Sequence, residues 1–238
     1  MATTVKKGFK RIILDIKDII EEPIDNIFYF PDEEDITNGY ALIIGPEDTP
    51  YQYGYYFFKI KFFEDTYPFS PPKVTFLTNN GITRFNPNLY KNGKVCLSIL
   101  NTWEGEPWSS CQTLRTILIT IQSILNENPL LNEPGINKNR HSTYISRYNK
   151  IITYENLNFS IYNYLSNQKN IPFPVTFHND VYSIILEKFN ENKIKIMDII
   201  DKKTKETFSL SSVLTIPCYN GEVNIDYENL KNKFSNLN

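Results

Sequence analysis

The sequence contains few cysteine and histidine residues, which limits the disulfide and metal sites it can form. Its three cysteines, Cys96, Cys111 and Cys218, are widely spaced and form no C-x-x-C pair. Its two histidines, His141 and His178, stand far from one another. Because disulfide frameworks and zinc sites need such residues in regular groups, the sequence supports neither.

Long apolar runs and an excess of basic residues are also missing. No stretch approaches the 18 apolar residues of a membrane-spanning helix, and the N-terminal M-A-T-T-V-K-K-G-F-K has no apolar segment of the signal-peptide type. The formal net charge is −2, whereas nucleic-acid-binding proteins normally carry a basic face. We therefore expect no membrane or nucleic-acid partner. We also expect an intracellular, cytoplasmic protein and leave a nuclear location open.

The composition is that of a globular protein, and its first predicted element is an amphipathic helix. Apolar residues make up 41% of the chain, which predicts a packed core. Over residues 9–20 they follow helical spacing, and Pro23 ends the helix. The members of this apolar stripe are Phe9, Ile12, Ile13, Ile16, Ile19 and Ile20. Lys10, Arg11 and Lys17 lie off the stripe, so we expect them to face solvent.

Four short strands are predicted next, with short loops that favour an antiparallel meander. They are residues 27–30, 40–45, 55–63 and 73–77. The Asn38-Gly39 pair before the second strand is typical of a tight hairpin turn. In the third strand, Phe58 and Ile60 alternate with Lys59, as expected for a half-buried strand.

An irregular stretch, residues 78–108, is too long to be an idle loop and separates the strands from a second helix at 112–126. Ser109, Ser110 or Thr113 is expected to cap this helix, and Asn128-Pro129 to end it. These elements define a core over residues 5–135 and an extension over residues 136–238.

The extension is too apolar to be disordered, so we expect it to pack on the core. Helices are predicted around residues 181–189 and 227–234. Short strands with an Asn220-Gly221 turn are expected within residues 194–224.

Cys96 lies in the irregular stretch, within R-F-N-P-N-L-Y-K-N-G-K-V-C-L-S-I-L (84–100). Lys91 and Lys94 are near in sequence and would favour a thiolate. However, V-C-L is typical of a buried strand, and no histidine is near in sequence to act as its base. These residues alone favour a structural cysteine and leave a nucleophile open.

Asn86 and Asn88 flank Pro87 in the same stretch and are able to form Asx turns. An asparagine amide can also donate a hydrogen bond to a developing oxyanion. A nucleophilic cysteine with such a donor suits acyl transfer through a thioester.

Further motifs extend this pattern to a family resemblance. Pro87-Asn88 is followed by Cys96 eight residues after the asparagine, and G-P-E-D-T-P-Y (45–51) and Y-P-F-S-P-P-K (67–73) lie upstream. Together they resemble the ubiquitin-conjugating enzyme family, whose signature is a His-Pro-Asn triplet eight residues before a catalytic cysteine. The two predicted helices also fall where that family has its first and second helices.

Within that family, the segment after Cys96 resembles one subgroup. C-L-S-I-L-N-T-W-E-G-E-P-W (96–108) suggests a widened loop, and N-E-P-G (132–135) follows the second helix. These features, with N-P-N in place of His-Pro-Asn, resemble the Z-type enzymes and the conjugating domains of very large conjugating proteins.

The resemblance implies an α+β fold: an N-terminal helix, a four-stranded antiparallel meander, an active-site loop, further helices and a mainly helical C-terminal extension. It implies that Cys96 accepts ubiquitin or a ubiquitin-like protein from an activating enzyme and passes it to a substrate lysine or a ligase. No cofactor is expected on the chain itself, because the activating enzyme uses the ATP. Asn88 would donate to the oxyanion or hold the loop in shape.

Other site residues follow from the same resemblance. Many relatives place an acidic residue beside the cysteine to receive the lysine proton, and the matching positions here are Leu131 or Asn132, with Glu133 or Glu127 as substitutes. Asn86 stands where the family has a histidine that is usually structural.

Partner contacts are implied at two places. Phe69 resembles an aromatic residue that contacts ligases, and Ser110 lies in the S-S-C that replaces the family's Ser-Pro-Ala. Lys10 and Arg11 align with residues that meet the activating enzyme. Trp103 and Trp108 are interpreted as packing anchors of the widened loop.

Two alternatives to an active conjugating enzyme remain. One is an inactive variant that serves as a binding scaffold, suggested by Asn86 and by the weak match at the lysine gate. The other is a cysteine hydrolase, for which the sequence offers no evident general base.

Overall fold

Helix α1 (Lys7–Glu21) opens the part of the chain that the structure describes. In this computed structural model those residues are 7–207 and 212–237. Ile12, Ile16 and Ile19 are buried, as predicted, whereas Ile13 and Ile20 are 40% and 55% exposed. Each of the two exposed residues follows a buried one by one position, a turn of about 100° around the helix. The buried stripe of α1 is therefore narrower than the sequence predicted.

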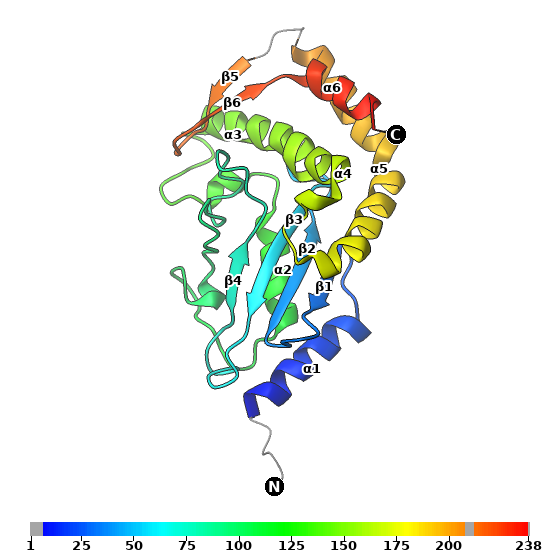
Figure 1. Cartoon of the computed structure of the whole chain (residues 1–238). Coiled ribbons are helices and arrows are strands. Elements are labelled where there is room, and N and C mark those ends of the chain that lie inside the picture. The colour runs from blue at the N-terminus through cyan, green and yellow to red at the C-terminus, as the bar shows by residue number, and fades with distance from the viewer. Residues whose placement is uncertain (1–6, 208–211, 238) are drawn as a thin grey trace.

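The strands form the predicted antiparallel meander, in the order β1-β2-β3-β4 (Figure 1). Their bounds are β1 (Ile27–Pro31), β2 (Asn38–Ile44), β3 (Tyr55–Lys61) and β4 (Lys73–Phe76). In β3, Phe58 and Ile60 are buried and Lys59 is half-buried, which confirms the predicted alternation. The expected fold class is confirmed.

The turn between β1 and β2 lies before Asn38-Gly39, so the predicted position of the hairpin turn is wrong. Asp35 forms the turn. Its Oδ1 accepts a hydrogen bond from the backbone N–H of Thr37 at 3.0 Å, and its Oδ2 accepts one from the side-chain Nδ2 of Asn38 at 2.6 Å. Gly39 lies inside β2, where a Cβ atom would collide with the ring of Tyr29. The glycine therefore permits a close approach rather than a turn.

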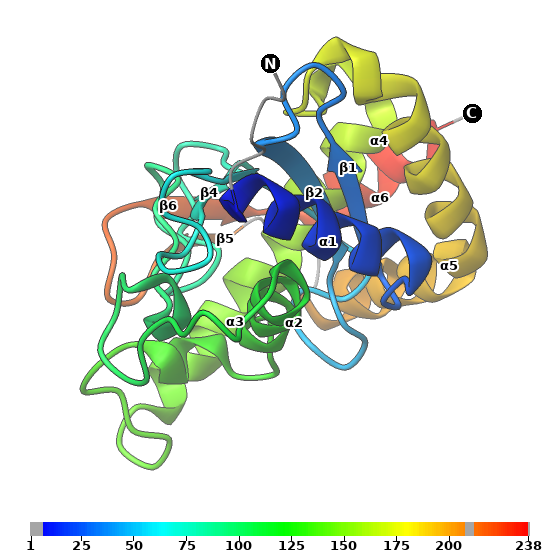
Figure 2. The same ribbon diagram turned by 90° about the horizontal axis from the view of Figure 1, so that it is seen from below.

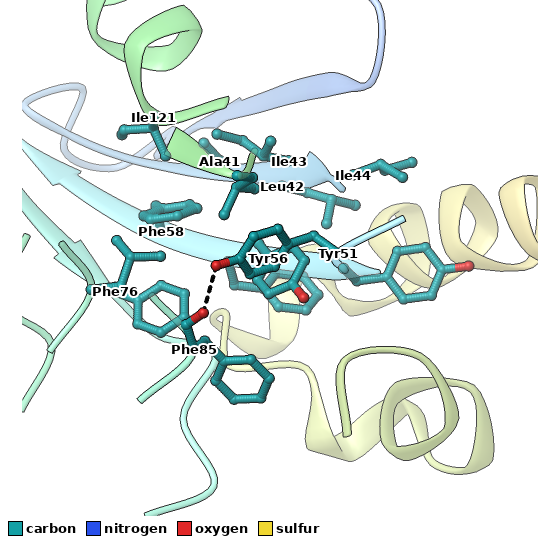
Figure 3. Packing of buried hydrophobic residues seen from close by; sticks show 14 of the residues in the cluster. Ala41, Leu42, Ile43, Ile44, Tyr51, Tyr56, Phe58, Phe76, Phe85 and Ile121 are labelled. Carbon is teal, nitrogen blue, oxygen red and sulfur yellow. Dashed lines mark hydrogen bonds between the residues drawn. The ribbon is translucent and has the colours of Figure 1, made fainter. Parts of the chain in front are cut away.

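Helix α2 (Leu114–Ile124) packs on one face of the sheet. Thr113 is its N-cap, and its Oγ1 accepts the backbone N–H of Thr116 at 3.3 Å. In Figure 3, Ile121 of α2 lies on the same side of the sheet as Ala41 and Ile43 of β2. The second predicted helix is thus found in its expected place.

The extension is mainly helical, as predicted. Its elements are α3 (Ser142–Glu155), a π-helical continuation (Asn156–Asn163), α4 (Tyr164–Ser166), α5 (His178–Thr207), the hairpin strands β5 (Ser212–Thr215) and β6 (Glu222–Ile225), and α6 (Tyr227–Ser235). Residues 194–207, where strands were expected, belong to α5, because Ile196 and Ile200 continue its buried stripe. Among the described residues, no helix is long and apolar enough to cross a membrane.

The extension covers the sheet face that α2 leaves open, so the sheet lies between α2 on one side and α4 and α5 on the other (Figure 2). Because successive strand residues point to opposite faces, Phe57 points away from Phe58. The ring of Phe57 contacts those of Tyr164 and Phe173, with centroids 4.7 and 5.0 Å apart. Tyr55 donates its hydroxyl to the carbonyl of Ile185 at 3.0 Å. The continuous aromatic run of β3 is explained by this burial on both faces.

The predicted division into a core and an extension at residue 135 stays a prediction. Contacts across that boundary are extensive, as the Phe57 and Tyr55 interactions illustrate. Residues 5 and 6, with which the predicted core begins, lie outside the described residues.

Glu155, at the end of α3, gives a testable dependence of stability on pH. It is 6% exposed, and Asn80 donates to its Oε2 at 2.5 Å. Burial raises the pKa of this carboxyl to about 7. Between the ordinary pKa and this raised one, the folded chain binds more protons than the unfolded chain. The free energy of unfolding should therefore fall as pH rises from about 4.5 to about 7.

Replacing Glu155 with glutamine should remove this dependence. The free energy of unfolding of E155Q minus that of the wild type should increase by about 2 to 3 kcal/mol from pH 5 to pH 8, as measured by urea unfolding at each pH. The exposed Glu34→Gln serves as the control and should show no such gain. An equal difference between E155Q and wild type at both pH values would contradict the prediction.

Candidate active site

Cys96 and Asn88 face each other across the loop that precedes the widened segment. The backbone N–H of Cys96 donates to the carbonyl of Asn88 at 2.9 Å. In return, the side-chain Nδ2 of Asn88 donates to the carbonyl of Cys96 at 2.7 Å. The structure thus brings together the predicted nucleophile and the predicted amide donor. Cys96 is only 1% exposed, so its neighbours cover nearly all of its surface.

The geometry of Asn88 suits both of its predicted roles. An asparagine amide carries two hydrogens. One is donated to the Cys96 carbonyl and fixes the loop, and the predicted oxyanion role requires the other. Its Oδ1 is buried and finds no partner among the described residues. A catalytic role for Asn88 stays a prediction that this arrangement supports.

Asn86 connects the same loop to the core. It is fully buried, and its Nδ2 donates to the hydroxyl of Tyr51 at 2.9 Å and to the carbonyl of Ile124 at 2.8 Å. Its Oδ1 accepts the backbone N–H of Asn88 at 2.9 Å. Tyr51 in turn donates to the carbonyl of Phe85 at 2.7 Å (Figure 3). Asn86 therefore supports the loop through α2 and Tyr51, without a hydrogen bond to Cys96.

Thr102 holds the backbone on both sides of Cys96, a role that no sequence motif indicated. Its hydroxyl oxygen accepts the backbone N–H of Leu97 at 3.0 Å. The same hydroxyl lies 2.7 Å from the carbonyl of Val95 and donates to it. These two hydrogen bonds hold the start of the widened loop against the residues on either side of Cys96.

Trp108 anchors the far end of the widened loop, as predicted. Its indole Nε1 donates to the carbonyl of Pro68 at 2.7 Å, and its ring lies 6.0 Å from that of Tyr67. Its backbone N–H donates to the side chain of Asn101 at 2.8 Å. Trp103 was expected to be a second anchor, but it is 41% exposed, so that expectation is wrong. The loop is held at its ends, and its middle faces solvent.

The predicted lysine gate adjoins the extension. The carboxylate of Glu133 accepts a hydrogen bond from the hydroxyl of Tyr219, in the turn between β5 and β6. The Nδ2 of Asn132 is buried and finds no partner among the described residues. Neither residue forms a hydrogen bond with Cys96 in the described part of the chain. Their roles in lysine activation therefore stay predictions, and the contact with Tyr219 was not foreseen.

The predicted partner contacts lie on two surfaces. Phe69 is 82% exposed in the proline-rich loop before β4, and Lys10 is exposed on α1. Arg11 was expected to face solvent, but its side chain is only 25% exposed. It pairs with Asp15 at 2.8 Å and donates to the carbonyl of Ser110 at 3.1 Å. The reason is that Asp15 lies one helical turn away and that the carbonyls of Ser110 and Gln112, in the segment before α2, accept hydrogen bonds from the guanidinium.

Metal and cysteine–histidine chemistry find no support in the described residues. No group of three or more histidine, cysteine, aspartate or glutamate residues within 7–207 and 212–237 is arranged to hold a metal ion. His178 lies 2.9 Å from the carbonyl of Phe173, and His141 contacts the backbone of Asn137 at 3.0 Å. Both histidines are thus engaged away from Cys96. The hydrolase alternative still lacks a general base.

Comparisons with known proteins identify the family of the chain. The family model described as ubiquitin-conjugating enzyme matches residues 11–155. Ubiquitin-conjugating enzyme E2 Z of Xenopus tropicalis is 37% identical over 229 residues, which cover 95% of this chain and 70% of that protein. The Homo sapiens protein of the same name is 43% identical over 173 residues, covering 72% of this chain and 49% of that protein.

A third relative comes from a much larger protein. The dual E2 ubiquitin-conjugating enzyme/E3 ubiquitin-protein ligase BIRC6 of Homo sapiens is 46% identical over 121 residues, covering 48% of this chain and 2% of that protein. The chain thus spans 70% of the Xenopus relative and about half of the human E2 Z. The resemblance inferred from the sequence is confirmed: the chain belongs to the ubiquitin-conjugating enzyme family, in its Z-type subgroup.

Proposed function

We propose that the chain carries ubiquitin, or a ubiquitin-like protein, as a thioester on Cys96. The thiolate of Cys96 attacks the thioester carbonyl on the activating enzyme, and the activating enzyme's own cysteine leaves as a thiolate. A substrate amine or a ligase cysteine then attacks the new thioester, and the Cys96 thiolate leaves. The observation that carries this proposal is the reciprocal pair of hydrogen bonds between Cys96 and Asn88 in a member of this family.

Asn88 serves both steps in this scheme. Each step passes through a tetrahedral oxyanion, which an amide hydrogen of Asn88 would stabilise. The proton of an attacking lysine also needs an acceptor, and the carboxylate of Glu133 is the proposed one; Asn132, beside it in the gate, would orient the lysine by a hydrogen bond. The chain itself needs no cofactor in this scheme, because ATP is consumed by the activating enzyme.

The proposed partners are the modifier, the activating enzyme, a ligase and the substrate lysines, inside the cell. Lys10 is exposed on α1 and, with Arg11, would meet the activating enzyme. Phe69 offers a largely exposed aromatic ring to a ligase. The bond from Trp108 to the carbonyl of Pro68 brings the loop of Phe69 close to the segment that contains Ser110.

A charging assay tests this proposal. The wild-type chain is mixed with ATP, ubiquitin and activating enzyme, in parallel with other modifiers and their own activating enzymes. We expect an adduct that a reducing agent releases. The absence of an adduct with every modifier, while a reference conjugating enzyme is charged in the same reactions, would refute the proposal. Charging without any discharge to lysine or to a ligase would instead favour the scaffold alternative.

A further inference from the structure

The turn between β5 and β6 reaches from the extension to the loop that carries Asn88. This hairpin tip, residues 216–221, lies against residues 82–91 of the core. The Nζ of Lys91 bridges the two segments, with the carbonyl of Asn220 at 3.2 Å and that of Ile82 at 3.1 Å. Gly221 has φ of 135°, and a Cβ atom there would lie 3.4 Å from the Ile82 carbonyl. The hairpin tip is therefore in direct contact with this part of the core.

Arg84 is the residue through which the hairpin tip meets the catalytic loop. Its guanidinium carbon lies 3.4 Å from the ring centroid of Tyr90 and 4.7 Å from that of Tyr219. Its Nη2 donates to the carbonyl of Pro87 at 2.5 Å, and its Nε to that of Asn86 at 3.3 Å. A planar guanidinium between two rings is held in one orientation. Arg84 thus fixes the two carbonyls immediately before Asn88.

Besides the contact of its ring with Arg84, Tyr219 forms a hydrogen bond with Glu133. Its hydroxyl donates to Glu133, and its ring lies 6.1 Å from that of Tyr148, whose hydroxyl donates to the Arg84 carbonyl at 2.5 Å. Burial, together with the bond to Glu133, raises the pKa of Tyr219, so the hydroxyl remains a donor at neutral pH. Tyr219 is therefore the residue of the extension that touches both the Arg84 side chain and the predicted lysine gate.

We propose that Tyr219 is a positioning residue for the transfer reaction, supplied by the C-terminal extension. Its ring holds Arg84, and the bonds from Arg84 to Asn86 and Pro87 fix the turn that presents Asn88 to Cys96. This inference rests on the proposed function of Cys96 and assigns a catalytic contribution to the extension. Tyr219 acts through Arg84 and Asn88 and does not itself touch the reacting atoms.

The test compares single-turnover discharge of the charged chain to free lysine. Tyr219→Ala should slow discharge by about tenfold, because small displacements of catalytic groups are costly. Arg84→Lys, which loses the fork and the stacking, should show a similar defect. Tyr219→Phe keeps the ring that contacts Arg84. Its discharge rate should therefore stay within about twofold of the wild-type rate.

A matched control separates positioning from simple stabilisation. Tyr162 is a half-buried tyrosine of the extension whose ring packs on Phe234, with centroids 5.5 Å apart. Tyr162→Ala should lower the free energy of unfolding without slowing discharge. If it slows discharge as much as Tyr219→Ala does, the proposal is overturned.

A double-mutant cycle tests the route through Asn88. If Tyr219 acts by positioning Asn88, Tyr219→Ala should have little further effect in an Asn88→Ala background. A full additional tenfold loss in that background would overturn the proposal.

Hydrogen exchange provides a readout that does not depend on activity. The Cys96 amide donates to the Asn88 carbonyl, so its exchange should be about tenfold faster in Tyr219→Ala than in the wild type and unchanged in Tyr162→Ala. If the wild type cannot be charged, the proposed function fails, while this measurement still supports or overturns the positioning by Tyr219.

Discussion

With Cys96 replaced by alanine, the chain is expected to form no thioester adduct with any modifier that charges the wild type. The physical reason is that a thioester requires the sulfur atom of Cys96, and alanine has no nucleophilic atom in its place. Cys96→Ser keeps an oxygen nucleophile in nearly the same volume. We expect it to accept the modifier much more slowly and to give an oxyester that resists the reducing agent. Gel electrophoresis with and without reducing agent distinguishes these results.

The other two cysteines provide the controls for this prediction. Cys111 and Cys218 are exposed, whereas Cys96 is buried. Cys111→Ser and Cys218→Ser should be charged as well as the wild type. An adduct that survives in Cys96→Ala but is lost in either control would assign the thioester to another residue and contradict the prediction.

The burial of Cys96 also bears on how charging proceeds. With 1% of its surface exposed, the cysteine cannot meet a thioester carbonyl until neighbouring atoms move. The middle of the widened loop, around Trp103, is exposed, whereas Thr102 and Trp108 hold its ends. We expect this segment to move when Cys96 is charged.

Local periodicity predicted most of the fold correctly. The stripes of α1 and α2 and the alternation in β3 follow from burying one side of each element. The same information did not separate a turn from a close approach at Asn38-Gly39, because both favour glycine. That distinction depends on Tyr29, which lies on the neighbouring strand.

The candidate site was predicted in part. The family resemblance, which rests on the eight-residue spacing and the flanking motifs, paired Asn88 with Cys96, and hydrogen bonds join the two residues in the structure. The contact between Tyr219 and Glu133 joins residues 86 positions apart, and no local pattern encodes it. Arg11 was placed in solvent because its partners on the segment before α2 are about 100 positions away. Long-range polar contacts were thus the part that periodicity did not predict.

Asn88→Ala is expected to slow discharge of the thioester to lysine by about 100-fold. Loss of a single oxyanion donor typically costs about 3 kcal/mol of transition-state stabilisation. The substitution also removes the donor to the Cys96 carbonyl, so a loss of about 1 to 2 kcal/mol in the free energy of unfolding should accompany it. Single-turnover discharge and urea unfolding measure the two effects separately.

Asn92→Ala is the matched control, because Asn92 is an exposed asparagine in the same loop whose side chain accepts the backbone N–H of Lys94 at 3.1 Å. Its discharge rate should stay within about twofold of the wild type. Asn88→Asp keeps the size but places a negative charge beside the oxyanion, so it should be at least as slow as Asn88→Ala. If folded Asn88→Ala discharges within threefold of the wild type, Asn88 is not the oxyanion donor. Its bond to the Cys96 carbonyl would then account for its place in the loop.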